Sequence, residues 1–276
     1  MIKKNLIIII IFTVFNACND KHVELYENGN LKKEYFLKDG MLNGNYKEFF
    51  FNGNLKVTHV YSNNKKIDSS VFYDKDDRIQ EVIYYKKNSD TVFCKEFDNQ
   101  KNILSKGFKF KGQKVKKWRF FKNGQIYKVN EYFIINGKQY TNQGWYFNKS
   151  GDTIIGKGVF MDLSIPKNGL INHEIPLKIF LKNPLISLES KVKLYVDLDP
   201  KNKINSDFSN LDKVRLIEIN HHPENTRFAG SNLVYRTSGI KTIKGYLLEY
   251  LEKTTTKNNI FRQEHRIYFS ISLHIN

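Results

Sequence analysis

The sequence predicts an all-β protein, with a meander of β-hairpins in its first half and an antiparallel β-sandwich in its second half. Three observations predict this fold. A turn motif recurs about every 24 residues through the first half, and short aromatic and β-branched runs separate the turns. In the second half, apolar and polar residues alternate over several segments. Such runs and alternation are typical of strands that turn one face to solvent.

The turn motif is clearest in the string NGNL, which occurs at 28–31 and again at 52–55. Aligning the chain on it gives intervals of 24, 24, 24, 23 and 27 residues between six turn positions, which are Gly29, Gly53, Asp77, Lys101, Gly124 and Gly151. Asn-Gly pairs favour two-residue hairpin turns, because both central residues need positive φ. Each repeat is therefore expected to form about one hairpin.

These hairpins are expected to pair edge to edge, because a single hairpin is only marginally stable in water. An aromatic residue precedes each turn residue by three or four positions, at Tyr26, Phe50, Tyr73, Phe97, Phe121 and Phe147. We expect these rings to form a ladder along one face that replaces a two-layer core. Burying each ring would stabilise the fold by roughly 1.5–3 kcal/mol.

The repeat resembles the MORN repeat, in the bacterial variant found in YwqK-type antitoxin proteins. The resemblance rests on segments such as YENGNLKKEYFLKDGMLNGNYKEF (26–49) and FKNGQIYKVNEYFIINGKQYTNQGWYF (121–147), and it covers about residues 24–160. Asp77 and Lys101 depart from the pattern, since they replace the turn glycine. The resemblance implies the hairpin-repeat fold, and it implies an antitoxin or immunity role in which a toxin is neutralised by direct binding.

A second domain is expected after the repeats, because all five prolines follow residue 165. The predicted organisation is a signal peptide at 1–17, hairpin repeats at 18–160 and a sandwich at 161–276. Alternation is clearest in IPLKIFL (175–181), VKLYVDL (192–198) and HRIYFSISLHI (265–275). The layout resembles an immunoglobulin-like domain without its Cys…Trp…Cys signature. The segment YLLEYLEK (246–253) fits either a strand or a short helix.

The N-terminus has the pattern of an export signal. A basic start precedes an apolar run from Leu6 to Phe15, which is too short for a stable membrane span. The following FNAC resembles the lipobox of bacterial lipoproteins, although Phe15 and Asn16 depart from it, and this implies a lipid on Cys18. A signal cleaved after Ala17 and an uncleaved anchor are the alternatives. We expect a lipoprotein that is exported and anchored in a membrane of a bacterial cell envelope.

The other cysteine, Cys94, occupies the repeat position held elsewhere by Tyr46, Ser70 and Trp118. It is expected to be a structural thiol, because the repeat supplies no activating base.

The formal net charge of +17 leaves a polyanionic partner open. The basic residues include only seven arginines, however, and nucleic-acid readers favour arginine for its two-pronged contacts. We therefore predict no nucleic-acid partner and attribute most of the charge to AT-rich coding.

No segment predicts a catalytic, cofactor or metal site. The string HHPE (221–224) places two histidines on opposite faces if it lies in a strand. The string DLDPKNKINSD (197–207) lacks the glycine and one oxygen ligand of a calcium loop. Phosphate-binding, zinc-protease and hydrolase motifs are missing from the sequence.

The sequence therefore favours a non-enzymatic, lipid-anchored envelope protein whose β surfaces bind a protein or a glycan. An antitoxin or immunity protein is the alternative, and an enzyme acting on envelope material is a third hypothesis.

Overall fold

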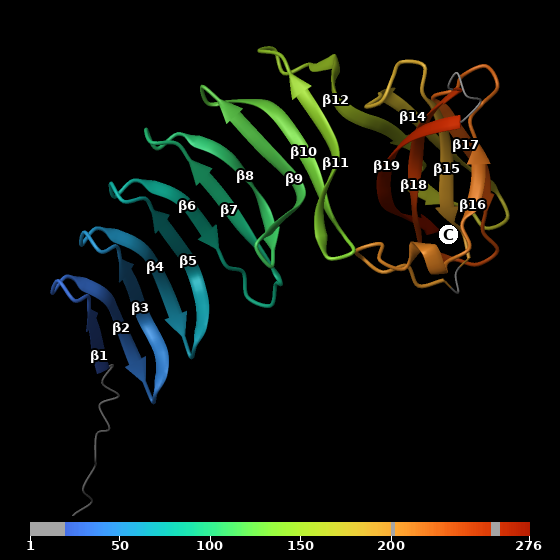
Figure 1. The fold of residues 1–276 in the computed structure, drawn as a ribbon. Helices are drawn as coiled ribbons and strands as arrows, with labels where there is room; N and C mark the ends of the chain where they lie inside the picture. Colours follow the sequence, from blue (N-terminus) through green and yellow to red (C-terminus); the bar gives the residue numbers. More distant parts are fainter. Residues whose placement is uncertain (1–19, 200–201, 255–259) are drawn as a thin grey trace, which may run out of the picture. The chain divides into compact units, whose positions relative to one another are not determined.

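The computed structural model describes residues 20–199, 202–254 and 260–276, and this part of the chain is all-β (Figure 1). A 3₁₀ helix, η1 (Leu211–Lys213), is the only helix among the described residues. Nothing in the described chain is a helix with the length and apolar character that a membrane crossing needs. The predicted signal peptide at 1–17 and the lipid site at Cys18 lie outside the described residues. The chain divides into two compact units between Lys87 and Asn88.

The first unit is a meander of antiparallel strands that pair in sequence order. Its strands are β1 (Asp20–Leu25), β2 (Leu31–Lys38), β3 (Met41–Phe49), β4 (Leu55–Ser62), β5 (Lys65–Tyr73) and β6 (Ile79–Tyr84). The expectation of edge-to-edge hairpins is confirmed here.

The second unit begins with the same kind of meander. Its strands are β7 (Thr91–Phe97), β8 (Ile103–Phe110), β9 (Gln113–Lys122), β10 (Gln125–Ile135), β11 (Lys138–Phe147) and β12 (Thr153–Ser164). β12 then pairs with β14 (Glu174–Asn183), and β14 pairs with β17 (Phe228–Val234), so the meander sheet continues into the C-terminal region. The predicted domain boundary at 160/161 falls inside β12.

A separate sheet completes the second unit. It has the order β13 (Asn168–Gly169), β19 (Ile260–Ile275), β18 (Gly239–Thr254), β15 (Lys191–Asp197) and β16 (Ile217–Asn220). Buried apolar side chains of β14 and β17 pack against those of β15, β18 and β19. The predicted sandwich is therefore present, and the alternating residues such as Leu177, Leu194 and Ile267 are its fully buried core. The ambiguous segment 246–253 lies in strand β18.

The recurring turns differ in type from the expectation. In the first one, the Tyr26 N–H donates to the Asn30 carbonyl at 2.8 Å, and the Gly29 N–H donates to the Tyr26 carbonyl at 2.9 Å. The same pair of bonds closes the loops that contain Gly53, Asp77, Lys101 and Gly151. This is a three-residue loop with a single positive-φ residue, whereas two-residue turns were expected. The expected type occurs at Asn123–Gly124, where φ is +52° and +74°.

The hydrogen bonds of the asparagines explain why NGNL occurs in two successive repeats. Asn28 and Asn30 both donate side-chain hydrogen bonds to the Phe51 carbonyl, at 3.1 and 3.0 Å. Asn52 and Asn54 repeat this arrangement on the carbonyl of Lys75. Each of these two turns therefore hydrogen-bonds to the loop of the next repeat, which helps to set the spacing of the hairpins.

Candidate functional site

The second unit carries a strongly basic run of strands. Between Asp98 and Glu131 the sequence contains no acidic residue and ten basic ones, which are Lys101, Lys106, Lys109, Lys111, Lys114, Lys116, Lys117, Arg119, Lys122 and Lys128. Lys101 lies in the loop before β8, and the others lie on β8, β9, the first part of β10 and the turns between them. Such a run concentrates positive potential on adjacent strands.

Strand register aligns three of the basic residues side by side on one face of the sheet. Lys95 of β7 lies directly opposite Lys106 of β8, and Lys106 lies directly opposite Arg119 of β9. The same cross-strand row continues to Val129 and then to Trp145. Neighbouring strands lie about 4.8 Å apart, and like charges at directly opposite positions destabilise a sheet. An anion placed over this row would relieve the repulsion.

Aromatic rings accompany the lysines of this face. The Lys106 ammonium lies 5.0 Å from the centre of the Phe121 ring, and the Lys117 ammonium lies 4.9 Å from that of Trp145. These are cation–π distances. The rings hold the lysine side chains across the face, and Arg119 is exposed. We call Lys95, Lys106, Lys117, Arg119 and Trp145 the basic face.

The opposite side of the same strands is a closed local core. Trp118 is fully buried, and its indole lies flat on Gly107, where a β-carbon would come within 2.5 Å of the ring. Glu96 accepts hydrogen bonds from Ser105 at 2.5 Å and from Lys114 at 3.0 Å. Burial opposes ionisation of Glu96, but these bonds outweigh it and lower its pKa. Glu96 and Lys114 on this side therefore partner each other.

The six predicted turn residues all adopt positive φ, from +59° at Asp77 to +89° at Gly53. They shape the hairpins and form no common surface site.

Cys94 is fully buried on the Trp118 side of the sheet, opposite Gly107. Among the residues that the structure describes, there is no cluster of three side chains suited to hold a metal ion. His222 accepts a hydrogen bond from the Glu224 N–H at 3.3 Å and packs on Phe228.

The first unit contains a buried histidine that sequence reasoning missed. Lys66 approaches His59 Nε2 at 3.2 Å, and an ammonium can only donate. His59 Nδ1 therefore carries the proton and donates to Ser70 Oγ at 2.6 Å, and Ser70 donates in turn to the Tyr85 hydroxyl at 3.0 Å. The Ser70 proton points away from the imidazole and Ser70 is fully buried, so this is no nucleophile–base pair.

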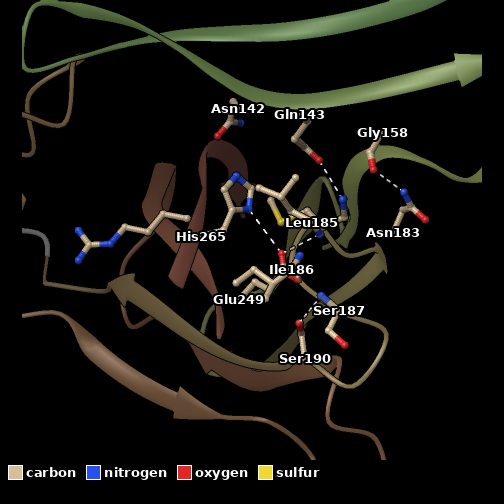
Figure 2. A network of polar contacts seen from close by, with 12 residues as sticks. Asn142, Gln143, Gly158, Asn183, Leu185, Ile186, Ser187, Ser190, Glu249 and His265 are labelled. Atoms are coloured by element: carbon tan, nitrogen blue, oxygen red, sulfur yellow. Dashed lines mark hydrogen bonds and ion pairs between the residues drawn. The ribbon is translucent and has the colours of Figure 1, made fainter. Parts of the chain in front are cut away.

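A second buried polar network lies in the second unit (Figure 2). Glu249 is fully buried and accepts hydrogen bonds from the backbone N–H groups of Leu185 at 3.0 Å and Ile186 at 2.8 Å. Burial opposes its ionisation, but the His265 imidazole, these N–H groups and Ser190 together lower its pKa. Because the carboxylate lies between Ser190 and His265, the order is not that of a serine–histidine–acid triad.

The run without acidic residues between Asp98 and Glu131 is visible in the sequence and could have indicated the basic face, but the net charge of the whole chain does not show it. The alignment of its residues into a row cannot be seen in the sequence, because it depends on strand register. A comparison of the chain with protein-family models gives no match, and a comparison with curated proteins gives no relative. The MORN resemblance and the antitoxin role that it implies therefore stay predictions.

Proposed function

We propose that the protein is a non-enzymatic, lipid-anchored envelope protein that binds an acidic glycan through the basic face of its second unit. The observation that carries the proposal is the cross-strand row Lys95–Lys106–Arg119 with its adjoining aromatic rings.

An acidic glycan matches this face in two ways. It carries carboxylates at regular intervals, and a row of cations about 4.8 Å apart can contact successive ones. Arg119 can bind a carboxylate with two parallel hydrogen bonds, which a lysine cannot do.

The anchor part of the proposal is supported by the leader sequence. The basic start, the apolar run and Cys18 after Ala17 together resemble a lipoprotein signal. An anchored binding module would hold the protein against the envelope polymer that it recognises.

The test is binding of the full chain to polygalacturonate, a carboxylated glycan, with neutral dextran as the control polymer. We expect the double variant Lys106→Glu, Arg119→Glu to bind polygalacturonate at least tenfold more weakly, because charge-assisted contacts contribute about 1.5–3 kcal/mol each. Raising the salt concentration should weaken binding by the unaltered protein, since Lys117 and Arg119 of this face are exposed.

The matched control is Lys75→Glu, Lys86→Glu, which makes the same change in net charge at two exposed lysines of the first unit. It should leave the affinity within about twofold, because neither lysine belongs to the basic face. Equal losses in both double variants would reduce the effect to net charge and contradict the proposal. Equal binding to dextran, or preferential binding to duplex DNA, would also contradict it.

A further inference from the structure

The second unit contains a cavity of about 270 Å³ that the proposed glycan face does not use. Residues of β10, β11 and β12 form one side of it, and Leu185 and His265 form another. Lys128, Asn130, Thr141 and Tyr146 also line it. Lys128 pairs with Phe120 across the strands, whereas the neighbouring Arg119 pairs with Val129. Because adjacent residues on a strand point to opposite faces, Lys128 and Arg119 lie on opposite sides of the sheet.

The walls of the cavity are held by hydrogen bonds to the backbone. The Asn142 side chain accepts from the Tyr268 N–H at 2.7 Å and donates to the Tyr268 carbonyl at 2.9 Å. The Gln143 side chain accepts from the Met161 N–H at 2.9 Å and donates to Glu131 at 2.9 Å. The Asn183 amide donates to the Gly158 carbonyl (Figure 2). These bonds preform the site without using the groups that face its interior.

His265 is oriented by the buried carboxylate behind it. Glu249 lies directly opposite His265 in the β18–β19 ladder, and Glu249 Oε2 is 3.6 Å from His265 Nδ1. At this distance the Nδ1 side of the ring faces the carboxylate. Figure 2 shows the other ring nitrogen turned away from Glu249, on the side of Asn142. Nε2 is therefore presented at the cavity wall.

The remaining lining groups define the chemistry of an occupant. The Lys128 ammonium lies 5.0 Å from the centre of the Tyr146 ring. Asn130 uses its nitrogen to donate to the Tyr132 hydroxyl at 2.9 Å, and its oxygen lies over Gly144. Of the described residues that line the cavity, two are basic and none is acidic. The site thus offers a cation for an anion, three groups for hydroxyl groups (an amide oxygen, the Thr141 hydroxyl and the imidazole Nε2), and a ring for an apolar face.

We propose that this cavity binds a small hydroxylated carboxylate of the size of one hexuronic acid. The carboxylate contacts Lys128, the hydroxyl groups contact Asn130, Thr141 and His265 Nε2, and the Tyr146 ring forms the apolar wall. The site is separate from the basic face, so it does not depend on the glycan-binding proposal.

The test is calorimetric titration of the full chain with D-glucuronate, and with D-glucose as the analogue that lacks the carboxylate. The unaltered protein should bind glucuronate saturably and glucose at least tenfold more weakly. Lys128→Met should weaken glucuronate binding at least tenfold, because it removes the ammonium and keeps an unbranched side chain of similar length. Lys149→Met, at an exposed lysine outside the cavity, should bind as the unaltered protein does.

His265→Gln is the second variant and should also weaken binding at least tenfold. If this variant fails to fold, as judged by circular dichroism, the comparison of Lys128→Met with Lys149→Met is sufficient to test the proposal. Three outcomes would each overturn the proposal: a titration with glucuronate that does not saturate, equal binding of glucose, or unchanged affinity in Lys128→Met. The Lys106→Glu, Arg119→Glu variant should retain glucuronate binding, and its loss there would place the sugar acid on the basic face instead.

Discussion

At the scale of single residues, burial in a one-layer sheet is achieved by long side chains that cover shorter ones. His59 is only 7% exposed although no second layer packs on it within the first-unit meander. The rings of Tyr46, Tyr61 and Phe72 surround it, at 5.6–5.9 Å between ring centres. Tyr35 stacks on Tyr46 in the same row. The rings that contact one another here all lie within strands, whereas the expected ladder was placed on the residues that precede the turns.

This burial makes the stability of the first unit dependent on pH. Desolvation, with a smaller contribution from Lys66, lowers the pKa of His59 from 6.5 to about 4. Below pH 6.5 the unfolded chain binds a proton that the folded chain binds only near pH 4, so stability falls as the pH is lowered through this window. The loss at pH 4 amounts to about 3 kcal/mol at most.

The measurement is urea unfolding of the unaltered protein and of His59→Gln at pH 7 and pH 4.5. The variant should be less stable at pH 7, because it disrupts the Lys66–His59–Ser70–Tyr85 chain, and it should lose less stability on acidification. Parallel losses in both proteins would assign the acid sensitivity to carboxylates elsewhere and would contradict the His59 account.

At the scale of structural elements, each three-residue loop of the repeat depends on one residue with left-handed backbone conformation. Two loops place a residue with a side chain there, Asp77 at φ +59° and Lys101 at φ +65°. Aspartates at the loop starts compensate. Asp98 accepts from the N–H groups of Gln100 and Asn102 at 2.9 and 2.8 Å, and Asp74 does the same for Asp76 and Arg78.

The substitution Lys101→Gly should therefore stabilise the second unit by about 1 kcal/mol, because the left-handed conformation costs a residue with a β-carbon about 1–2 kcal/mol. Lys122→Gly is the matched control, since Lys122 lies in β9 and lacks a positive φ. It should destabilise by roughly 0.5–1 kcal/mol. Urea unfolding of both variants measures the difference, and a loss of stability in Lys101→Gly would show that the Asp98 bonds already remove the strain.

At the scale of the whole molecule, the excess charge is unevenly distributed along the chain. The acid-free run between Asp98 and Glu131 contributes ten of the basic residues, so part of the net charge of +17 is local to one set of strands. A local concentration of charge favours a local polyanionic partner more than a general coding bias does. The distribution of the lysines therefore supports a polyanionic partner more than their total number does, while glycan recognition remains a proposal.

The anchor is also a property of the whole molecule. Membranes of cells that produce the protein should release it with detergent and retain it in high salt, because a lipid holds through apolar contact that salt does not screen. Cys18→Ala should move the protein to the salt-soluble fraction, whereas Cys94→Ala should not. Release of the unaltered protein by salt alone would rule out the lipid anchor.

The sequence by itself determined the all-β class, the hairpin repeats and the buried faces of the sandwich strands. These are local properties. A residue such as Gly29 meets a φ requirement set by its own turn, and the alternation around Leu177 follows from the pleat of its own strand. Single residues and their immediate neighbours determine these properties, so they can be predicted without knowing which strands pair in the sheet.

Only the tertiary structure decided the groups of residues that form candidate sites. Lys95, Lys106 and Arg119 align because β-bulges and loop lengths set one register, and a shift of one residue would turn each side chain to the other face. Glu249 meets Leu185 across 64 residues and His265 across the β18–β19 pair. Such contacts depend on which strands become neighbours, and this follows from burial of the whole core and not from any short stretch of sequence.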